Sequence, residues 1–316
     1  MKRTAALAAA AAALYIVIPL RTSDYWLSVL NLAGIAAIGA AGLNLLSGYC
    51  GQLSLGHAAF LGTGAYVCAA LGAPLWVAVP AAALLGAALG VLVTPFAVRL
   101  RTHTLAIATL ALVFIGQHVF REWTSVTGGN AGRSDLPVVD LPGAADQGWF
   151  WLVWPLVAAS VALVAAIARS RLGRDMAAVR ADERAAAVVG VNVAATKAAA
   201  FALSGALAAA AGALYGAYKG YVGPEDWGLL VSIQYLAMVL IGGIGTVKAP
   251  VVGALFVTAL PRLVEEVVSP GTAPQVTQIF FGLAIVAVAS LRRRGVDVTA
   301  RPRPRSTASC ADQPQL

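Results

Sequence analysis

The sequence predicts an all-α fold: a polytopic membrane helical bundle of about ten transmembrane spans, within a range of roughly eight to ten. Of the 316 residues, 59% are hydrophobic and only 11% are charged, whereas soluble domains have about a quarter of their residues charged. From Tyr25 to Val98 there is no Asp, Glu, Lys or Arg. A soluble core could not bury so long an uncharged stretch, so a water-soluble enzyme is excluded.

Apolar runs of span length recur along the chain, since a helix needs about 20 mostly apolar residues to cross the hydrocarbon. The runs that we interpret as spans are residues 5–20, 27–46, 58–72, 74–97, 104–120, 149–168, 198–218, 228–247, 250–268 and 275–291. The first run resembles a signal peptide, but Ile18–Arg21 offers no small-residue cleavage site. We therefore expect one integral-membrane domain over residues 1–316 that keeps its first span.

The arginines predict the orientation in the membrane. Arg-rich pieces occur at Met1–Arg3, Arg99–Arg101, Arg169–Lys197 and Arg292–Arg305. Even numbers of predicted spans separate them, so all four can be cytoplasmic, as the positive-inside rule requires. Both termini are then cytoplasmic, and residues 292–316 form an Arg/Pro-rich tail that we expect to be disordered. The net charge of +8 thus reports orientation beside membrane lipid and does not indicate nucleic-acid binding.

The stretch Gly42–Tyr66 combines many glycines with polar side chains inside an apolar region. Each glycine costs a helix about 1 kcal/mol relative to alanine, and irregular backbone at membrane depth is tolerated only in contact with protein or a watery cavity. Residues Gly48–Gly56 are compatible with a tight turn or with a re-entrant segment. The helix that follows from about Ser54 is expected to line a substrate pathway, with polar groups from Gln52, Ser54 and His57 and from Ser232 and Gln234 near a later span.

His57 has no carboxylate, Cys or His partner at helical spacing, so a hydrogen-bonded packing role competes with a proton relay. The three cysteines, Cys50, Cys68 and Cys310, show no metal-binding or redox spacing. The sequence therefore predicts no metal site.

The loop from Arg169 to Lys197 is the largest predicted cytoplasmic segment between spans, and its centre predicts a helix over Leu172–Gly190. At 100° per residue an apolar stripe forms that contains one acid. The stripe consists of Leu172, Met176, Val179, Glu183, Ala186 and Gly190. This pattern suits insertion into a partner's groove, but a solvated helix with intrahelical ion pairs fits it equally well.

With these motifs in order, the chain resembles the membrane permease subunits of branched-chain amino acid ABC importers, the LivM-like family. The resemblance covers roughly residues 27–291. It rests on Gly42–Tyr66, Arg99–Leu110, Thr127–Gly132, Leu172–Asn192, Gly212–Tyr215 and Leu240–Thr246.

The resemblance implies that Glu183, Ala185 and Gly190 belong to the EAA coupling loop, which docks on the ATP-hydrolysing subunits; Met176 and Val179 share its apolar stripe. It also implies three kinds of partner: a second homologous permease chain, two ATP-binding cassette ATPase subunits and an extracytoplasmic substrate-binding protein. The expected location is the bacterial inner membrane.

No phosphate-binding G-x-x-x-x-G-K-[ST] motif occurs, so we expect no cofactor in this chain and ATP bound by its partners. The predicted spans carry no Asp or Glu except Glu265-Glu266 at the end of one, which argues against an ion-coupled secondary transporter. A membrane transferase would need paired acidic clusters, and Asp182-Glu183 lacks a second one. We therefore expect a transporter and not an enzyme. Its cargo is expected to be branched-chain or other hydrophobic amino acids, with urea, short amides or aromatic acids as the alternative.

Overall fold

The computed structural model describes residues 21–100, 102–136 and 145–267, together with the single positions 15, 19, 282 and 283. The predicted first and last spans and the tail 292–316 lie outside these segments. In chain order the α-helices of six or more residues are α2 (Asp24–Leu43), α3 (His57–Leu71), α4 (Leu75–Arg99), α5 (Thr102–Glu122), α7 (Ala145–Arg169), α8 (Arg171–Ala181), α9 (Glu183–Val188), α10 (Val193–Lys219), α11 (Leu229–Gly242) and α12 (Ala249–Val267). Short turns complete them: η1 (Asn44–Tyr49), α6 (Thr124–Thr127), η2 (Gly129–Ala131) and η3 (Pro224–Trp227).

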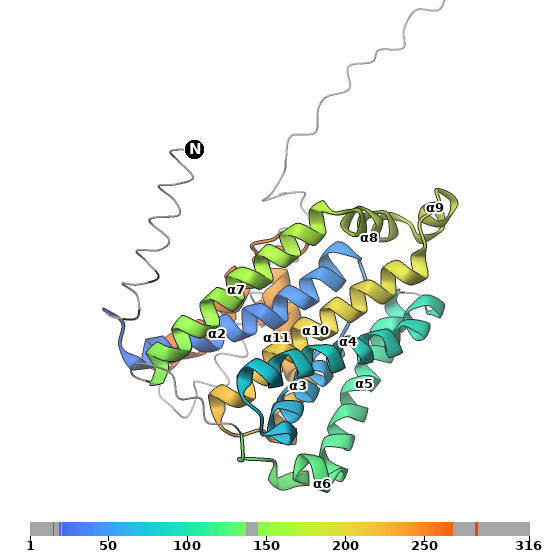
Figure 1. Ribbon diagram of the computed structural model, residues 1–316. Helices are drawn as coiled ribbons and strands as arrows, with labels where there is room; N and C mark the ends of the chain where they lie inside the picture. The colour runs from blue at the N-terminus through green and yellow to red at the C-terminus, as the bar shows by residue number, and fades with distance from the viewer. Residues whose placement is uncertain are drawn as a thin grey trace, which may run out of the picture.

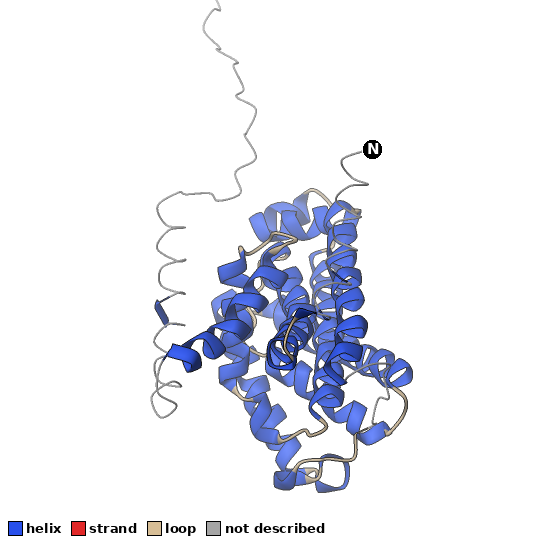
Figure 2. Cartoon of the chain, turned by 90° about the vertical axis from the view of Figure 1, so that its left-hand side faces the viewer, coloured by secondary structure: helices blue, strands red, loops and turns tan. Residues whose placement is uncertain are grey.

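The described part of the chain is a helical bundle, as predicted (Figures 1 and 2). Its extended pairing is limited to one antiparallel bridge between Arg133 and Val222. Five helices are long and apolar enough to cross a membrane: α2 continued by η1, α4, α5, α7 and α10. Three apolar helices, α3, α11 and α12, are shorter. These eight helices coincide with the eight predicted runs between residues 27 and 268, and the total of ten spans stays a prediction.

Helix α10 packs on α2, α3 and α4 through small residues. A Cβ atom at Gly64 in α3 would overlap the carbonyl oxygen of Ala209 in α10, and one at Gly212 would overlap that of Leu61. Gly86 in α4 meets Gly205 in α10 in the same way. In lipid, no hydrophobic force drives helices together, so this backbone approach is what holds them. The glycines inside the apolar runs therefore serve packing.

The two ends of the bundle carry different loops. At one end, Arg99 from α4 lines a cavity together with Arg180 and Arg184 from the α8–α9 region; we call this the arginine-rich end. At the other end, Arg121 pairs with Glu225 at 2.7 Å, and residues 133 and 222 form the backbone bridge. The predicted cytoplasmic pieces around Arg99 and Arg169–Lys197 thus meet at one end, as the parity of spans requires.

Close packing at Gly64 predicts a specific sensitivity. Gly64→Val should lower the free energy of unfolding by about 2 kcal/mol or more, because the new side chain meets rigid backbone of α10. Ala70→Val is the matched control, because Ala70 is an exposed residue of the same helix. Thermal unfolding of the detergent-solubilised protein measures both, and equal midpoints for the two variants would contradict the packing role.

Candidate functional site: the re-entrant segment and the loop at the arginine-rich end

Helix α3 begins inside the bundle and not at its end. The chain leaves η1 at Tyr49, runs without helix through residues 50–56 and starts α3 at His57. The Nε2 of His57 hydrogen bonds at 2.9 Å to the carbonyl oxygen of Gly39. Gly39 lies ten residues before Tyr49, which is about 15 Å along a helix. Residues 50–56 therefore form a non-helical segment that returns into the bundle, which supports the re-entrant reading of Gly48–Gly56 over the tight turn.

Side-chain hydroxyls accept hydrogen bonds from backbone N–H groups of this segment and of the first turn of α3. The hydroxyl of Ser232 in α11 accepts from the N–H of Ala58 at 3.0 Å, and Thr109 Oγ1 in α5 accepts from Leu55 N–H at 3.0 Å. Ser54 Oγ accepts from Gly56 N–H at 3.3 Å. Irregular backbone needs such partners at membrane depth.

The predicted pathway residues therefore lie in three separate places. Ser54, His57 and Ser232 meet at the start of α3, where all three are buried and each makes a hydrogen bond to backbone. The packing role considered for His57 is what its geometry supports. Gln234 lies elsewhere, on the wall of a separate cavity. Contact of any of them with substrate stays a prediction.

Gln52 belongs to a charged network at the arginine-rich end. Its side-chain amide donates to the Glu183 carboxylate at 3.2 Å. The ammonium of Lys197 in α10 lies 2.8 Å from the same carboxylate and donates to the carbonyl oxygen of Ala97 in α4 at 2.8 Å. Lys197 is fully buried, whereas the Glu183 side chain is 40% exposed. The network joins the loop to the re-entrant segment, α4 and α10.

Arg180 makes a second connection between the loop and the re-entrant segment. Its guanidinium donates to the carbonyl oxygen of Gly48, and its side chain covers Gly51, where a Cβ would lie 2.8 Å from Arg180 Cγ. Gly51 also has φ +75°, so only glycine suits this position.

Asn44 ties the same region to the connection between α11 and α12. Its amide nitrogen donates to Thr246 O and its amide oxygen accepts from Gly245 N–H, both at 2.8 Å. Both groups of the Asn44 side chain are thus used within one loop.

The predicted continuous helix over Leu172–Gly190 is wrong: the chain forms α8 and α9 with a break at Asp182. Asp182 is extended (φ −162°, ψ 119°), and its carboxylate accepts from the N–H groups of Arg184 at 2.8 Å and Ala185 at 3.0 Å. These hydrogen bonds, first that from Ala185, lower the pKa of Asp182 below its usual value. An aspartate that caps α9 in this way cannot also continue α8.

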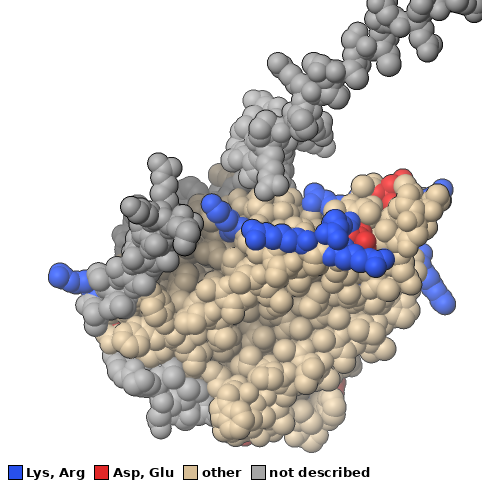
Figure 3. Space-filling view, turned by 45° about the horizontal axis from the view of Figure 1, so that its top comes forward, with Lys and Arg blue, Asp and Glu red and all other residues tan. Residues whose placement is uncertain are grey.

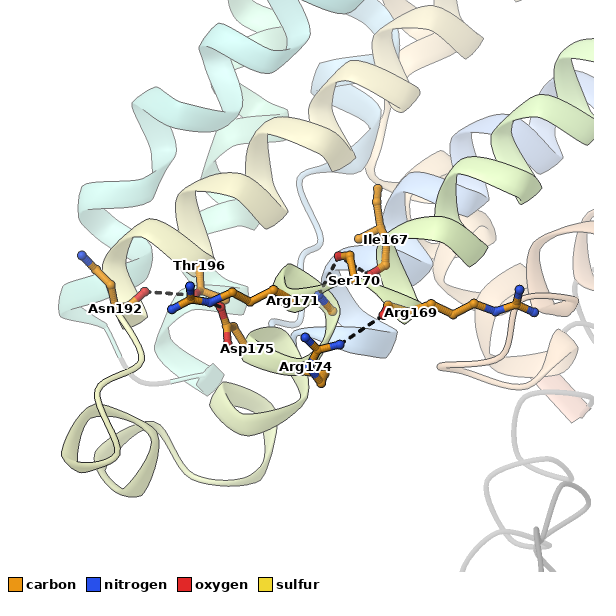
Figure 4. Close-up of polar contacts among 9 residues, drawn as sticks. Ile167, Arg169, Ser170, Arg171, Arg174, Asp175, Asn192 and Thr196 are labelled. Carbon is orange, nitrogen blue, oxygen red and sulfur yellow. Dashed lines mark hydrogen bonds and ion pairs between the residues drawn. The ribbon is translucent and has the colours of Figure 1, made fainter.

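Figures 3 and 4 show how the loop presents its charge. Lys and Arg side chains gather along one edge of the molecule (Figure 3). Close to the loop's start, Ser170 caps α8 by accepting from Gly173 N–H at 3.4 Å, and Arg174 donates to Arg169 O at 3.2 Å (Figure 4). Arg171 lies 3.9 Å from Asp175, one turn on. The arginines therefore lie on the exposed side of the loop.

The predicted coupling residues face in opposite directions. Met176 and Val179 are buried with Ala186 in this chain's own core, beside Leu45, Leu46 and Phe201. Ala185 and Gly190 are exposed, and between them Val188 and Val189 are 87% and 76% exposed. The apolar stripe thus anchors the loop to its own bundle. The exposed valine pair was missed, although two adjacent β-branched residues in a charged loop are a signal of it.

A cavity of about 540 Å³ opens between the loop and the re-entrant segment. Its wall includes Cys50, Gly51, Gln52, Arg99, Arg180, Asp182, Glu183 and Arg184. Among the described residues, no group of three or more His, Cys, Asp or Glu is placed to hold a metal ion. The arrangement is a polar junction between a loop and broken membrane backbone.

Comparison of the sequence with known proteins places the chain in a family. Residues 25–289 match the family described as "branched-chain amino acid transport system / permease component". The chain belongs to this family of transport permeases.

Individual members of the family are similar to most of the chain. It is 31% identical over 278 residues to the high-affinity branched-chain amino acid transport system permease protein LivM of Escherichia coli (strain K12), covering 78% of this chain and 65% of that protein. LivM of Salmonella typhimurium is 30% identical over 278 residues, again covering 78% of this chain and 65% of that protein. The chain thus spans slightly less than two thirds of these relatives. The autoinducer 2 import system permease protein LsrC of Klebsiella pneumoniae is 33% identical over 187 residues, which cover 56% of this chain and 51% of that protein. No solved structure matches the chain.

The Glu183–Lys197 pair predicts a measurable cost for removing one partner. Lys197→Met should lower the free energy of unfolding by about 1–3 kcal/mol, less than for a fully buried pair because Glu183 is 40% exposed. Thermal unfolding in detergent measures it. Adding Glu183→Gln should restore part of the loss, because the unpaired charge is then removed.

Arg171→Met is the matched control, since it breaks an exposed i,i+4 pair with Asp175 of the kind that contributes roughly 0.3–0.5 kcal/mol. A Lys197→Met variant no less stable than Arg171→Met would show that the buried pair has no structural role.

Proposed function

We propose that this chain is a transmembrane permease subunit of an ATP-driven importer for branched-chain or other hydrophobic amino acids. The observation that carries the proposal is the match of residues 25–289 to the permease family, together with two relatives named for branched-chain amino acid transport. The apolar helices agree with a multi-pass location in the bacterial inner membrane. In this proposal a second, homologous permease chain completes the translocation pathway.

The partners proposed on the cytoplasmic side are two ATP-binding cassette ATPase subunits, which bind the ATP. The docking surface proposed for them is the exposed part of the loop: Ala185, Val188, Val189 and Gly190. Val188 and Val189 are 87% and 76% exposed. Burial of their side chains in a partner's groove would remove this apolar surface from water, which favours binding. An extracytoplasmic binding protein would deliver substrate to the opposite end.

In this proposal Glu183 does not contact the ATPase subunits, although the sequence led us to expect that it would; it holds the loop against its own chain. Its carboxylate is bonded to Gln52 and Lys197 of its own chain, so it transmits movement and does not itself form the docking surface. Movement of α9 would pull on the re-entrant segment through Gln52, and movement of α8 would do so through Arg180 and Gly48. The start of α3 lies at the far end of that segment, so the loop and the membrane interior are mechanically linked.

Cargo is tested by uptake. Cells that express the chain with its partner subunits should accumulate radiolabelled leucine or valine, and accumulation should cease when the ATPase subunits are inactivated. Urea, short amides and aromatic acids serve as competitors. Competition by one of these with no uptake of aliphatic amino acids would replace the proposed cargo. Uptake driven by an ion gradient without ATP hydrolysis would replace the proposed class.

Coupling through the loop predicts the effect of charge at the valine pair. Val188→Asp with Val189→Asp should leave the chain folded, because both side chains are exposed, yet lower substrate-stimulated ATP hydrolysis of the assembled importer about tenfold or more. Ala194→Asp, at an exposed position in the first turn of α10, is the control. Unchanged stimulation in the double variant would move the docking surface elsewhere.

The orientation predicts the labelling of single cysteines. A cysteine at Ala131, exposed at the end opposite the arginine-rich end, should react with an impermeant thiol reagent in whole cells, and one at Ala181 should not. Cys50 and Cys68 are both buried. A Cys310→Ser background therefore suffices. The reverse labelling pattern would invert the topology.

A further inference from the structure

A small cavity of about 200 Å³ is lined by residues of α2, α10 and α11 and by Asp226 and Trp227 of η3. It shares no residue with the larger cavity at that end. Drug-sized ligands occupy pockets of about 300–1,000 Å³, so this one suits a smaller molecule. Leu61 on its wall lies one turn after the start of α3, and Tyr235 on its wall has its ring 5.3 Å from that of His57.

An unpartnered donor belongs to this wall. Trp227 is 3% exposed, and its indole Nε1–H has no hydrogen-bond partner among the described residues. A buried donor without a partner costs about 1–3 kcal/mol, so its presence beside a cavity indicates a group that the cavity receives. The ring itself is fixed, because it packs over Gly62 of α3 and lies edge-on to Tyr215 at 5.5 Å.

An acid without a cation stands next to it in the chain and on the same wall. Asp226 accepts from Gly223 N–H at 2.9 Å through one carboxylate oxygen. Among the described residues Asp226 forms no salt bridge within 4.0 Å. The nearby Arg121 pairs with Glu225 instead. The carboxylate therefore has remaining acceptor capacity for another partner.

The rest of the wall consists of aliphatic residues, the side chains of Tyr215, Tyr235 and Thr258, and one amide. The apolar residues are Leu32, Ile35, Ala36, Leu61, Val231 and Met238. Gln234 adds a side-chain amide that can donate or accept. An acid, two neutral N–H donors and an aliphatic wall together match a small molecule with a cation, an anion and a hydrocarbon side chain.

We propose that this cavity binds an aliphatic α-amino acid as its zwitterion. Asp226 accepts from the ammonium, Trp227 Nε1–H and the Gln234 amide donate to the carboxylate, and the aliphatic wall receives the side chain. The inference rests on the proposed function, which it deepens by naming the site and the recognised form of the substrate. Of these residues, sequence reasoning selected only Gln234.

Binding to the purified permease–ATPase complex, without the binding protein, tests the site, because a binding protein would mask the permease's own affinity. The probes are radiolabelled leucine and two analogues, 4-methylpentanoic acid without the ammonium and 3-methylbutylamine without the carboxylate. Asp226→Asn should weaken leucine and the amine about tenfold and leave the acid unchanged. Trp227→Phe should weaken leucine and the acid severalfold and leave the amine unchanged.

Two matched controls separate the site from general effects. Glu225→Gln removes the adjacent exposed acid, and Trp154→Phe removes another indole N–H that has no partner among the described residues but does not line this cavity. Both should bind leucine like the parent chain. The amide oxygen of Asp226→Asn can still accept from Gly223, so the turn is retained, and unchanged binding of the analogue that each variant is expected to keep shows that its cavity is folded.

The outcomes distinguish the two proposals. If the complete importer takes up no branched-chain amino acid, the proposed function fails. If uptake is normal but leucine does not bind the complex, or binds both site variants as tightly as the controls, only this site is wrong. Equal loss of both analogues in either variant would also overturn it, because the assigned charges would then have no separate roles.

Discussion

Backbone hydrogen bonding is the constraint on which this structure depends. A chain that interrupts its helix inside a membrane must find partners for the freed N–H and C=O groups. Here residues 50–56 break the path between α2 and α3, and the partners come from three directions: Ser54 within the segment, Thr109 in α5 and Ser232 in α11. Few polar side chains occur in these helices, and these ones are placed at the interruption.

The buried charge at the arginine-rich end also needs hydrogen-bond partners. Lys197 is buried, and it is stabilised by the Glu183 carboxylate and a backbone carbonyl of α4. A buried cation is costly unless it is paired and hydrogen bonded, so this network fixes where the loop can lie. The loop's apolar residues add to the restraint, because Met176 and Val179 pack inward. The outward surface of the loop is left to arginines and to the two valines at the end of α9.

Much of the fold could be predicted from the sequence, because lipid imposes strong rules on composition. Apolar runs located the helices, but the close backbone contacts at Gly64 and Gly212 are seen only in the structure. The parity of arginines predicted that Arg99 and the loop share one end. Local patterns were weaker guides. The stripe over Leu172–Gly190 has helical periodicity, yet Asp182 supplies a cap that starts a new helix, and periodicity does not register a cap.

Partners distant in sequence were beyond such reasoning. Lys197 is a single charge at the end of a polar loop, and only the fold brings it to Glu183 and Ala97. Trp227 and Asp226 likewise lie in a short turn between helices, and their relation to a cavity depends on α2 and α10. His57 and Ser232, which pattern reasoning did select, both hydrogen bond to backbone, and their contact with substrate stays a prediction.

The double hydrogen bond of Asn44 has a consequence for how the bundle can deform. It joins the end of α2 to the connection between α11 and α12. Arg180 joins α8 to Gly48, which lies four residues after Asn44, by a further hydrogen bond. Sliding of α2 past the α11–α12 pair would break the Asn44 bonds, whereas rotation of all these helices as one body would leave them intact. The hydrogen bonds at this end thus favour hinge-like tilting of these helices as one body over shear between them. The hinge is then expected in a part of the bundle that lacks such hydrogen bonds.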